Sequence, residues 1–336
     1  MLIPLIIIVV TLILMLLAII RNWRIHFKKI TFKLYWVFPL IGALLCVTCG
    51  FISPENLADI FINSSNINPL KILIIFLSCT SLSVFLDQIG FFRYVAGIVA
   101  EKSKSSQTKL FFASSIIIAL LTIFTSNDIL ILTFTPFICY FAKRAKINPL
   151  PFIISEFVTA NTWSMFFIIG NPTNIYIGTT FGIPFIDYAA RMFLPTIIAG
   201  VTSLLIVYLL FRKKLKQPIS APAEKLTRPN GVLLAIGLIG LATAVILMAI
   251  SSYTGWPLWI MPLSCSILTY LAAFIYLACK KKTFAVIKNS LKNLPYGLVP
   301  FLLSMSIIVA TLDQIGLISY LAEFFSGNNI FLTGFV

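Results

Sequence analysis

Apolar segments long enough to cross a bilayer dominate this chain of 336 residues. A membrane-spanning helix needs about 20 mainly apolar residues, and residues 2–20 meet that length without the flanking features of a cleaved signal peptide. Hydrophobic residues make up 60% of the chain and charged residues 10%, against about 45–50% and about 25% in soluble domains. A soluble fold is therefore excluded, and we predict an all-α polytopic membrane protein. The apolar segments run over residues 2–20, 35–52, 70–99, 110–125, 129–142, 150–182, 189–211, 231–250, 257–279 and 295–324.

The positive charge of the chain is concentrated between these segments. Residues 21–33, 102–109, 143–146, 212–228 and 280–292 hold 22 of the 25 Lys and Arg residues. A net charge of +15 in a soluble protein would point to nucleic acid, but in a membrane protein Lys and Arg mark the cytoplasmic loops. We therefore predict a multi-pass protein of the inner cell membrane. Its basic loops lie in the cytoplasm, its N-terminus lies outside, and nucleic acid is not a partner.

The segment between two of these basic loops is short for two crossings. Residues 110–142 number about 33, whereas two full spans need about 40. A re-entrant helical hairpin, which enters from the cytoplasm and returns to it, resolves the mismatch. Its tip would be Ser126-Asn127-Asp128, and non-helical backbone at that depth must be buried in protein or line a cavity.

The next segment is too long for one straight crossing. Residues 150–182 would form a helix of about 50 Å, whereas the hydrocarbon core is about 30 Å thick. The sequence Gly-Asn-Pro-Thr-Asn at residues 170–174 interrupts the segment, because Gly and Pro together break a helix. We predict a discontinuous helix with a polar break.

An internal repeat organises the chain. The sequence Leu-Asp-Gln-Ile-Gly occurs at residues 86–90 and again at residues 312–316, an offset of 226 residues. The first two apolar segments also have counterparts at this offset, and the loop charges give the two copies opposite orientations. This is the inverted-topology repeat of many secondary transporters. Asp87 and Asp313 belong to the repeated turn, where we expect them to cap a bend.

The repeat predicts three parts in the chain. Residues 1–211 form the first transmembrane repeat, residues 212–230 a cytoplasmic linker, and residues 231–336 the beginning of the second repeat. The counterpart of the hairpin tip would fall near position 352, so the second repeat is expected to be incomplete. One hypothesis is therefore a non-transporting, truncated fragment, whose transport would return when the residues after 336 are supplied.

Small polar residues at the hairpin tip and in the helix break form the candidate binding site. Broken helices in a membrane present helix ends and backbone groups that bind ions and charged substrates. Asp128 at the tip and Glu156, before the break, are the candidate proton carriers, because acids inside a membrane are functional candidates. The candidate binding residues are Ser126, Asn127, Asp128, Asn161, Thr162, Gly170, Asn171, Pro172, Thr173 and Asn174.

The sequence does not indicate metal or cofactor chemistry. The six cysteines lie in or beside apolar segments, and the pair Cys46 and Cys49 has no second pair with which to form a zinc site. The single histidine, His26, lies in a basic loop. We predict no metal centre, no cofactor and no enzyme activity; the coupling ion would be Na⁺ or H⁺.

Several of these motifs resemble the arsenite permease (arsenical pump membrane protein) family. That family belongs to the ion transporter superfamily, with citrate carriers and divalent anion:sodium symporters. The stretch from Ala160 to Asn174 is more similar to the sodium-coupled dicarboxylate branch. The motifs similar to arsenite permeases are Leu86 to Phe92, Asn127-Asp128 followed by Leu132-Thr133 and Thr135-Pro136, and Phe181-Gly182 followed by Phe185 and Asp187-Tyr188-Ala189.

The resemblance implies roles for particular residues. Ser126 and Asn127 match a hairpin tip that contacts sodium and a substrate carboxylate, and Gly170, Pro172 and Asn174 match the break in the following helix. The resemblance also implies a Na⁺ site at Ser126, Asn127 and Gly170. It also implies a homodimer and, for arsenite permeases, a soluble ATPase partner.

We therefore expect a secondary active transporter of anions or metalloid oxyanions that works by alternating access. An arsenite- or antimonite-type permease is the first hypothesis. The alternative is a sodium- or proton-coupled symporter of di- or tricarboxylates such as citrate, or of sulfate. The partners on either hypothesis are a small anionic or oxyanion substrate and the lipid bilayer.

Overall fold

The computed structural model describes residues 2–27, 30–59, 61, 68–103, 106–125, 127–216 and 227–319. Regular structure over these residues is helical, apart from one antiparallel pair of short strands, β1 (Arg24–Phe27) and β2 (Ile30–Lys33). The predicted all-α polytopic membrane fold is confirmed, with this strand pair as an addition. Six of the described helices are long and apolar enough to cross a membrane: α1 (Leu2–Ile20), α4 (Pro69–Gln88), α6 (Gln107–Phe124), α10 (Phe185–Leu215), α11 (Gly231–Thr254) and α12 (Ile260–Cys279).

The chain divides into two compact units. The first contains residues 1–73 and 295–336, and the second contains residues 74–294. In the first unit, the 3₁₀ turn η1 (Leu34–Trp36) leads into α2 (Val37–Thr48), and α3 (Pro54–Ala58) follows. Helix α2 packs against both α1 and α14 (Leu298–Gln314). The buried side chains that join these three helices are Ile8, Ala43, Cys46 and Ile308.

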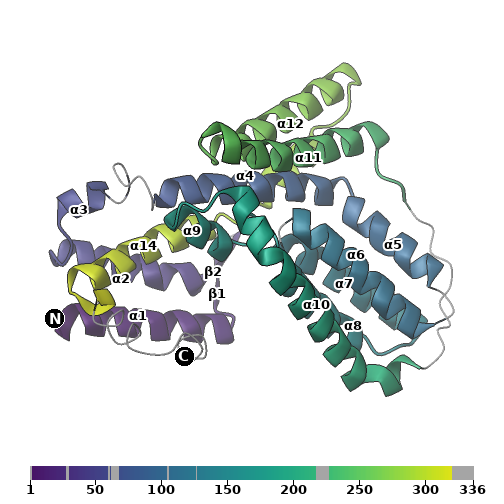
Figure 1. The fold of residues 1–336 in the computed structure, drawn as a ribbon, viewed down its shortest axis with the longest axis horizontal. Coiled ribbons are helices and arrows are strands. Elements are labelled where there is room, and N and C mark those ends of the chain that lie inside the picture. Colours follow the sequence, from purple (N-terminus) through teal and green to yellow (C-terminus); the bar gives the residue numbers. More distant parts are fainter. Residues whose placement is uncertain are drawn as a thin grey trace. The chain divides into compact units, whose positions relative to one another are not determined.

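The second unit contains the predicted hairpin and the broken helix. Helix α8 (Leu150–Trp163) packs against α6, α7 (Asn127–Ala145) and α10, and these helices lie side by side in Figure 1. Helices α11 and α12 form a separate pair (Figure 1), and Phe85, Leu233, Ala273 and Leu277 form a core cluster there. The remaining helices of this unit are α5 (Phe91–Lys102), α9 (Pro172–Thr180) and α13 (Ala285–Lys292).

The apolar segment 70–99 is two helices, because the repeated motif ends the first one. Helix α4 ends at Gln88, and Gly90 has φ = 85°, in the left-handed region that glycine adopts without strain. The second copy behaves in the same way: α14 ends at Gln314, and Gly316 has φ = 79°. The two copies of the motif therefore share one backbone turn, while their opposite orientation in the membrane stays a prediction.

The hairpin helices are longer than their predicted bounds. Helix α6 has 18 residues and α7 has 19, so each is about 27 Å long, close to the hydrocarbon thickness of about 30 Å. Length alone therefore does not separate a re-entrant hairpin from two full crossings. The prediction that this hairpin enters and leaves on the same side of the membrane is supported by the basic residues in both flanking loops.

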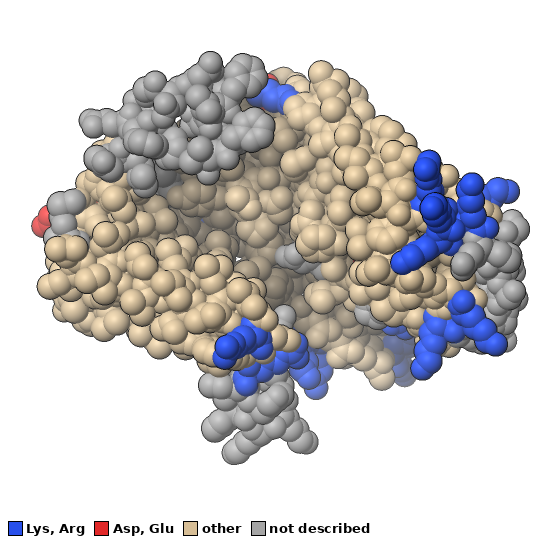
Figure 2. All heavy atoms as spheres, turned by 90° about the horizontal axis from the view of Figure 1, so that it is seen from below, with Lys and Arg blue, Asp and Glu red and all other residues tan. Residues whose placement is uncertain are grey.

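Charged side chains are gathered rather than spread over the surface. Figure 2 shows Lys and Arg in a few groups on an otherwise largely uncharged face, where Asp and Glu are scarce. Lys102, Lys109, Lys143 and Lys146, which flank the hairpin in sequence, are all exposed.

Candidate functional site

The discontinuous helix is confirmed, but its break covers residues 164–171, and Pro172, Thr173 and Asn174 of the predicted break form the first turn of the second helix. Helix α8 ends at Trp163, and α9 begins at Pro172. Asn171 caps α9, since its Oδ1 accepts a hydrogen bond from the backbone N–H of Asn174 at 2.9 Å. Proline at the first helical position suits this start, because that position needs no N–H donor.

The side chain of Asn174, in the first turn of α9, bonds to the backbone of the break. Its side-chain amide donates to the carbonyl oxygens of Ser164 at 2.9 Å and Phe167 at 3.3 Å. Gly170 sits against the same carbonyl of Ser164, so closely that a Cβ atom at position 170 would overlap its oxygen. The break therefore requires both an amide at 174 and a glycine at 170.

A chain of hydrogen bonds joins the break to the beginning of α7. The side-chain amide of Asn127 donates to Oδ1 of Asn161 at 3.1 Å, and the Ser164 hydroxyl donates to the carbonyl oxygen of Asn161 at 2.8 Å. The side-chain amide of Asn171 then donates to Oγ of Ser164 at 3.3 Å. We call Asn127, Asn161, Ser164, Asn171 and Asn174 the polar network.

Aromatic side chains surround the break. The ring of Phe167 lies 5.7 Å from that of Phe124 on α6 and 5.0 Å from that of Phe185 on α10. The ring of Phe166 lies 6.1 Å from that of Phe193. Aromatic pairs stabilise a fold beyond the effect of burying their surface. These rings therefore help to fix the backbone of the break, which carries part of the polar network.

The structure brings together only part of the predicted site. Asn127 and Asn174 are buried, at 6% and 8% exposure, while Asn161 and Thr173 are exposed. Over the described residues, the side chains of Thr162 and Thr173 make no hydrogen bond to the polar network. Ser126 and the side chain of Asp128 lie outside the described residues.

Two acids contact α7 through threonines that the site prediction left out. Oε2 of Glu156 accepts from the Thr135 hydroxyl at 2.9 Å, and Oδ1 of Asp87 accepts from the Thr133 hydroxyl at 2.7 Å. The expectation that Asp87 caps a bend is wrong for its side chain. The Gly90 N–H closes that bend on the backbone oxygen of Asp87, at 2.8 Å, so the carboxyl is left to bind α7.

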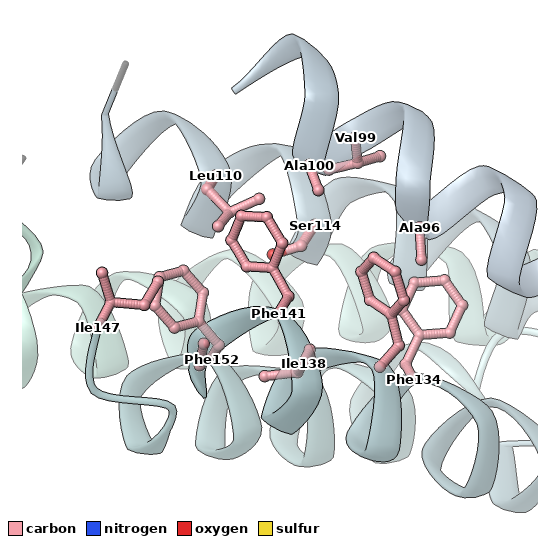
Figure 3. Close-up of a pocket in the computed structure, with 12 residues that line it drawn as sticks. Ala96, Val99, Ala100, Leu110, Ser114, Phe134, Ile138, Phe141, Ile147 and Phe152 are labelled. Carbon is pink, nitrogen blue, oxygen red and sulfur yellow. The ribbon is translucent and has the colours of Figure 1, made fainter. Parts of the chain in front are cut away.

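An apolar cavity lies away from the polar network. It is formed between α5, α6, α7 and α8, and Ser114 is its one polar lining residue (Figure 3). An anion or a metal ion would find no charged partner there, so the cavity is not the candidate binding site. Nor, within the described part of the chain, do three His, Cys, Asp or Glu side chains gather as metal ligands.

The polar network offers chemistry suited to a hydroxylated or anionic ligand. Two helices begin at it, α7 at Asn127 and α9 at Pro172, and a helix N-terminus carries a partial positive charge. Asparagine amides supply both donors and acceptors. Ser164 also belongs to this network; the predicted binding residues do not include it, although its position just before the break indicates it.

Comparison with known proteins shows similarity to membrane transporters. The chain is 23% identical over 307 residues to a putative arsenical pump membrane protein of Bacillus subtilis (strain 168), covering 84% of this chain and 67% of that relative. It is 26% identical over 291 residues to the arsenical pump membrane protein of Escherichia coli (strain K12), covering 84% and 65%. A 46 kDa membrane protein of Mycobacterium leprae is 27% identical over 173 residues, covering 52% and 40%. The chain thus spans at most about two thirds of the length of these curated relatives.

A family model described as citrate transporter, CitMHS, matches residues 15–336. The match runs through both hairpin helices, the broken helix and the second copy of the repeated motif. The resemblance drawn from the motifs to the superfamily of arsenite permeases and citrate carriers is thereby confirmed. The chain belongs to the CitMHS citrate transporter family.

Proposed function

We propose that this chain is a secondary transporter of anions or metalloid oxyanions, and that the polar network binds the substrate. The observation that carries the proposal is the bond from Asn127 to Asn161, because it joins the beginning of α7 to the break before α9. Substrate binding where two broken elements meet is the arrangement of many secondary transporters. On this proposal the chain works by alternating access.

An arsenite- or antimonite-type permease is the first candidate. The two relatives that match 84% of this chain both have arsenical pump membrane protein in their names. Asparagine amides and the Ser164 hydroxyl can donate to and accept from the hydroxyl groups of a metalloid oxyacid. They carry no charge of their own, which suits a ligand that is weakly charged at neutral pH.

A carrier of di- or tricarboxylates, or of sulfate, is the second candidate. The description of the family model, citrate transporter, favours it, and the two helix N-termini would help to bind carboxylates. On this alternative Na⁺ would bind beside the substrate, at Ser126, Asn127 and Gly170. Transport of arsenite and of citrate by the same purified protein separates the two candidates.

The placement in the cell is part of the proposal. The basic loops would face the cytoplasm and the N-terminus the outside of the inner membrane. The homodimer and the soluble ATPase partner implied by the resemblance remain proposals, and copurification with an affinity-tagged copy would test both.

The test of the site is transport by the Asn127→Ala variant in proteoliposomes. Removing the amide takes away the donor to Oδ1 of Asn161, and with it the bond that joins the beginning of α7 to the break. We expect saturable uptake of arsenite or citrate to be lost, or its apparent affinity to fall by about tenfold or more.

The matched control is Asn289→Ala. Asn289 is an exposed asparagine on α13, so this change should leave uptake as it is. Transport by the Asn127→Ala variant with unaltered affinity would show that the binding site lies elsewhere.

A further inference from the structure

Glu156 is a buried acid with one unused oxygen. It lies on α8 with 1% of its surface exposed. Its Oε2 accepts the hydrogen bond from Thr135, and its Oε1 has no hydrogen-bond partner over the described residues. Buried polar atoms are nearly always paired, so an unpaired carboxylate oxygen calls for an explanation.

Asp87 provides a comparison within the same unit. It also accepts a hydrogen bond from a threonine of α7, but its second oxygen, Oδ2, accepts from the side-chain amide of Gln88 at 3.2 Å. It is only half-buried. The two acids therefore differ in one respect that matters: Glu156 alone has a buried oxygen free to carry a proton while its other oxygen stays bonded to α7.

Within the described part of the chain, no cation pairs with Glu156 to hold it as an anion. Next to it on α8, Ser155 is bonded to Ser115 of α6 at 2.6 Å. Phe134 and Phe152, which line the apolar cavity (Figure 3), lie one residue before Thr135 and four residues before Glu156 in the sequence. Over the described residues no charged side chain pairs with Glu156.

The helices packed against α8 carry other charged or titratable residues. These are Lys109 on α6, then Asp128, Cys139, Tyr140, Lys143 and Arg144 on α7, and Asp187, Tyr188, Arg191, Tyr208, Arg212, Lys213 and Lys214 on α10.

Glu156 and the polar network are connected through the same two helices. Helix α7 contacts α8 at Asn127 through Asn161, and eight residues further on at Thr135 through Glu156. A hydroxyl bond to a carboxylate is roughly twice as strong as one to a neutral acid. Proton binding to Glu156 therefore weakens a side-chain bond that holds α7 against α8.

We propose that Glu156 is the proton-binding residue that couples transport to a proton gradient, acting on the binding site through Thr135 and α7. This rests on the proposed function. The carboxylate takes up a proton on Oε1 to give the neutral acid, and it releases that proton when the site faces the other side. No other bond forms or breaks, and the coupling ion is H⁺ rather than Na⁺.

The test compares two transport modes of the intact protein in proteoliposomes, with arsenite and, in parallel, citrate. Net transport is driven by an imposed pH gradient, and exchange is measured at equal pH on both sides. Glutamine is close in shape to the protonated acid and cannot release a proton. In Glu156→Gln we expect net transport to fall by about tenfold or more, while exchange stays within about twofold of wild type.

Asp87→Asn is the matched control, since it removes the charge of the other threonine-bonded acid. It should keep the wild-type ratio of net transport to exchange. Thr135→Val should shift the pH dependence of exchange, and Thr135→Ser should restore it, because serine keeps the hydroxyl. These threonine variants keep Glu156 in place, so they test the coupling even if Glu156→Gln is unstable.

Three results would overturn the inference and leave the proposed function standing: Glu156→Gln loses exchange together with net transport, Glu156→Gln keeps both, or a sodium gradient drives the wild type where a pH gradient does not. If the wild type transports neither arsenite nor citrate under any gradient, it is the proposed function that fails.

Discussion

The side-chain amide of Asn127 donates a hydrogen bond to Oδ1 of Asn161 over 3.1 Å, and so joins the first residue of α7 to the last turn of α8. The two residues are 34 positions apart in the sequence. Asn127 is buried while Asn161 is exposed, so the bond lies at the edge of the packed interior, where a ligand can reach it.

Asn174→Ala should destabilise the break. The amide of Asn174 is the donor to two carbonyl oxygens, those of Ser164 and Phe167, and leaving a buried acceptor unpaired costs about 1–3 kcal/mol. We expect a lower melting temperature of the purified protein in detergent, together with loss of transport. Thr173→Ala, at the exposed neighbouring position, should leave the melting temperature unchanged. An equal loss of stability in both variants would contradict the role given to Asn174.

Gly170→Ala should abolish transport, because the added Cβ atom would overlap the carbonyl oxygen of Ser164. The backbone of the break must then move, and with it the amides of the polar network. Gly231→Ala is the control: a Cβ atom there meets nothing within 4 Å, and alanine favours a helix over glycine by about 1 kcal/mol. Measured uptake should be lost in the first variant and retained in the second.

Gly200→Val should displace the indole of Trp163. A Cβ atom at position 200 would lie 2.6 Å from atoms of that ring, and Trp163 is the last residue of α8 before the break. Inserting extra groups into a packed core typically costs about 1–3 kcal/mol, so both stability and substrate affinity should fall.

Trp163→Leu should partly rescue Gly200→Val, because it vacates the space that the valine needs. A double-mutant cycle on melting temperature measures this coupling. Purely additive effects of the two changes would show that the contact does not transmit strain to the break.

The predicted orientation can be checked with cysteine labelling. Tyr253, near the end of α11, and Lys282, after α12, are both exposed, and the positive-inside rule places the first outside and the second in the cytoplasm. In a background without native cysteines, Tyr253→Cys should react with a membrane-impermeant thiol reagent in intact cells. Lys282→Cys should react only after the membrane is opened, and the reverse pattern would invert the topology.

The sequence by itself identified the elements whose cause is local. The apolar segments and the presence of a break in the segment 150–182 follow from hydrophobic runs and from Gly, Pro and Asn within the same segment, although the break lies at residues 164–171 and not at the predicted residues 170–174. The turn expected at the repeated motif is local as well, because Gly90 divides the segment 70–99 into two helices through its left-handed backbone.

The pairing of side chains was decided by tertiary structure alone. Helix α8 packs against both hairpin helices, and this placement brings Asn127 to Asn161 and Thr135 to Glu156. A contact between α4 and α7 likewise pairs the carboxyl of Asp87 with Thr133, 46 residues away, instead of with a cap in its own turn. The sequence could nominate Asn127, Asn174 and Glu156 as polar residues in an apolar region. Which of them meet depends on how three helices pack, and helix packing is fixed by the fit of whole faces rather than by any residue's neighbours along the chain.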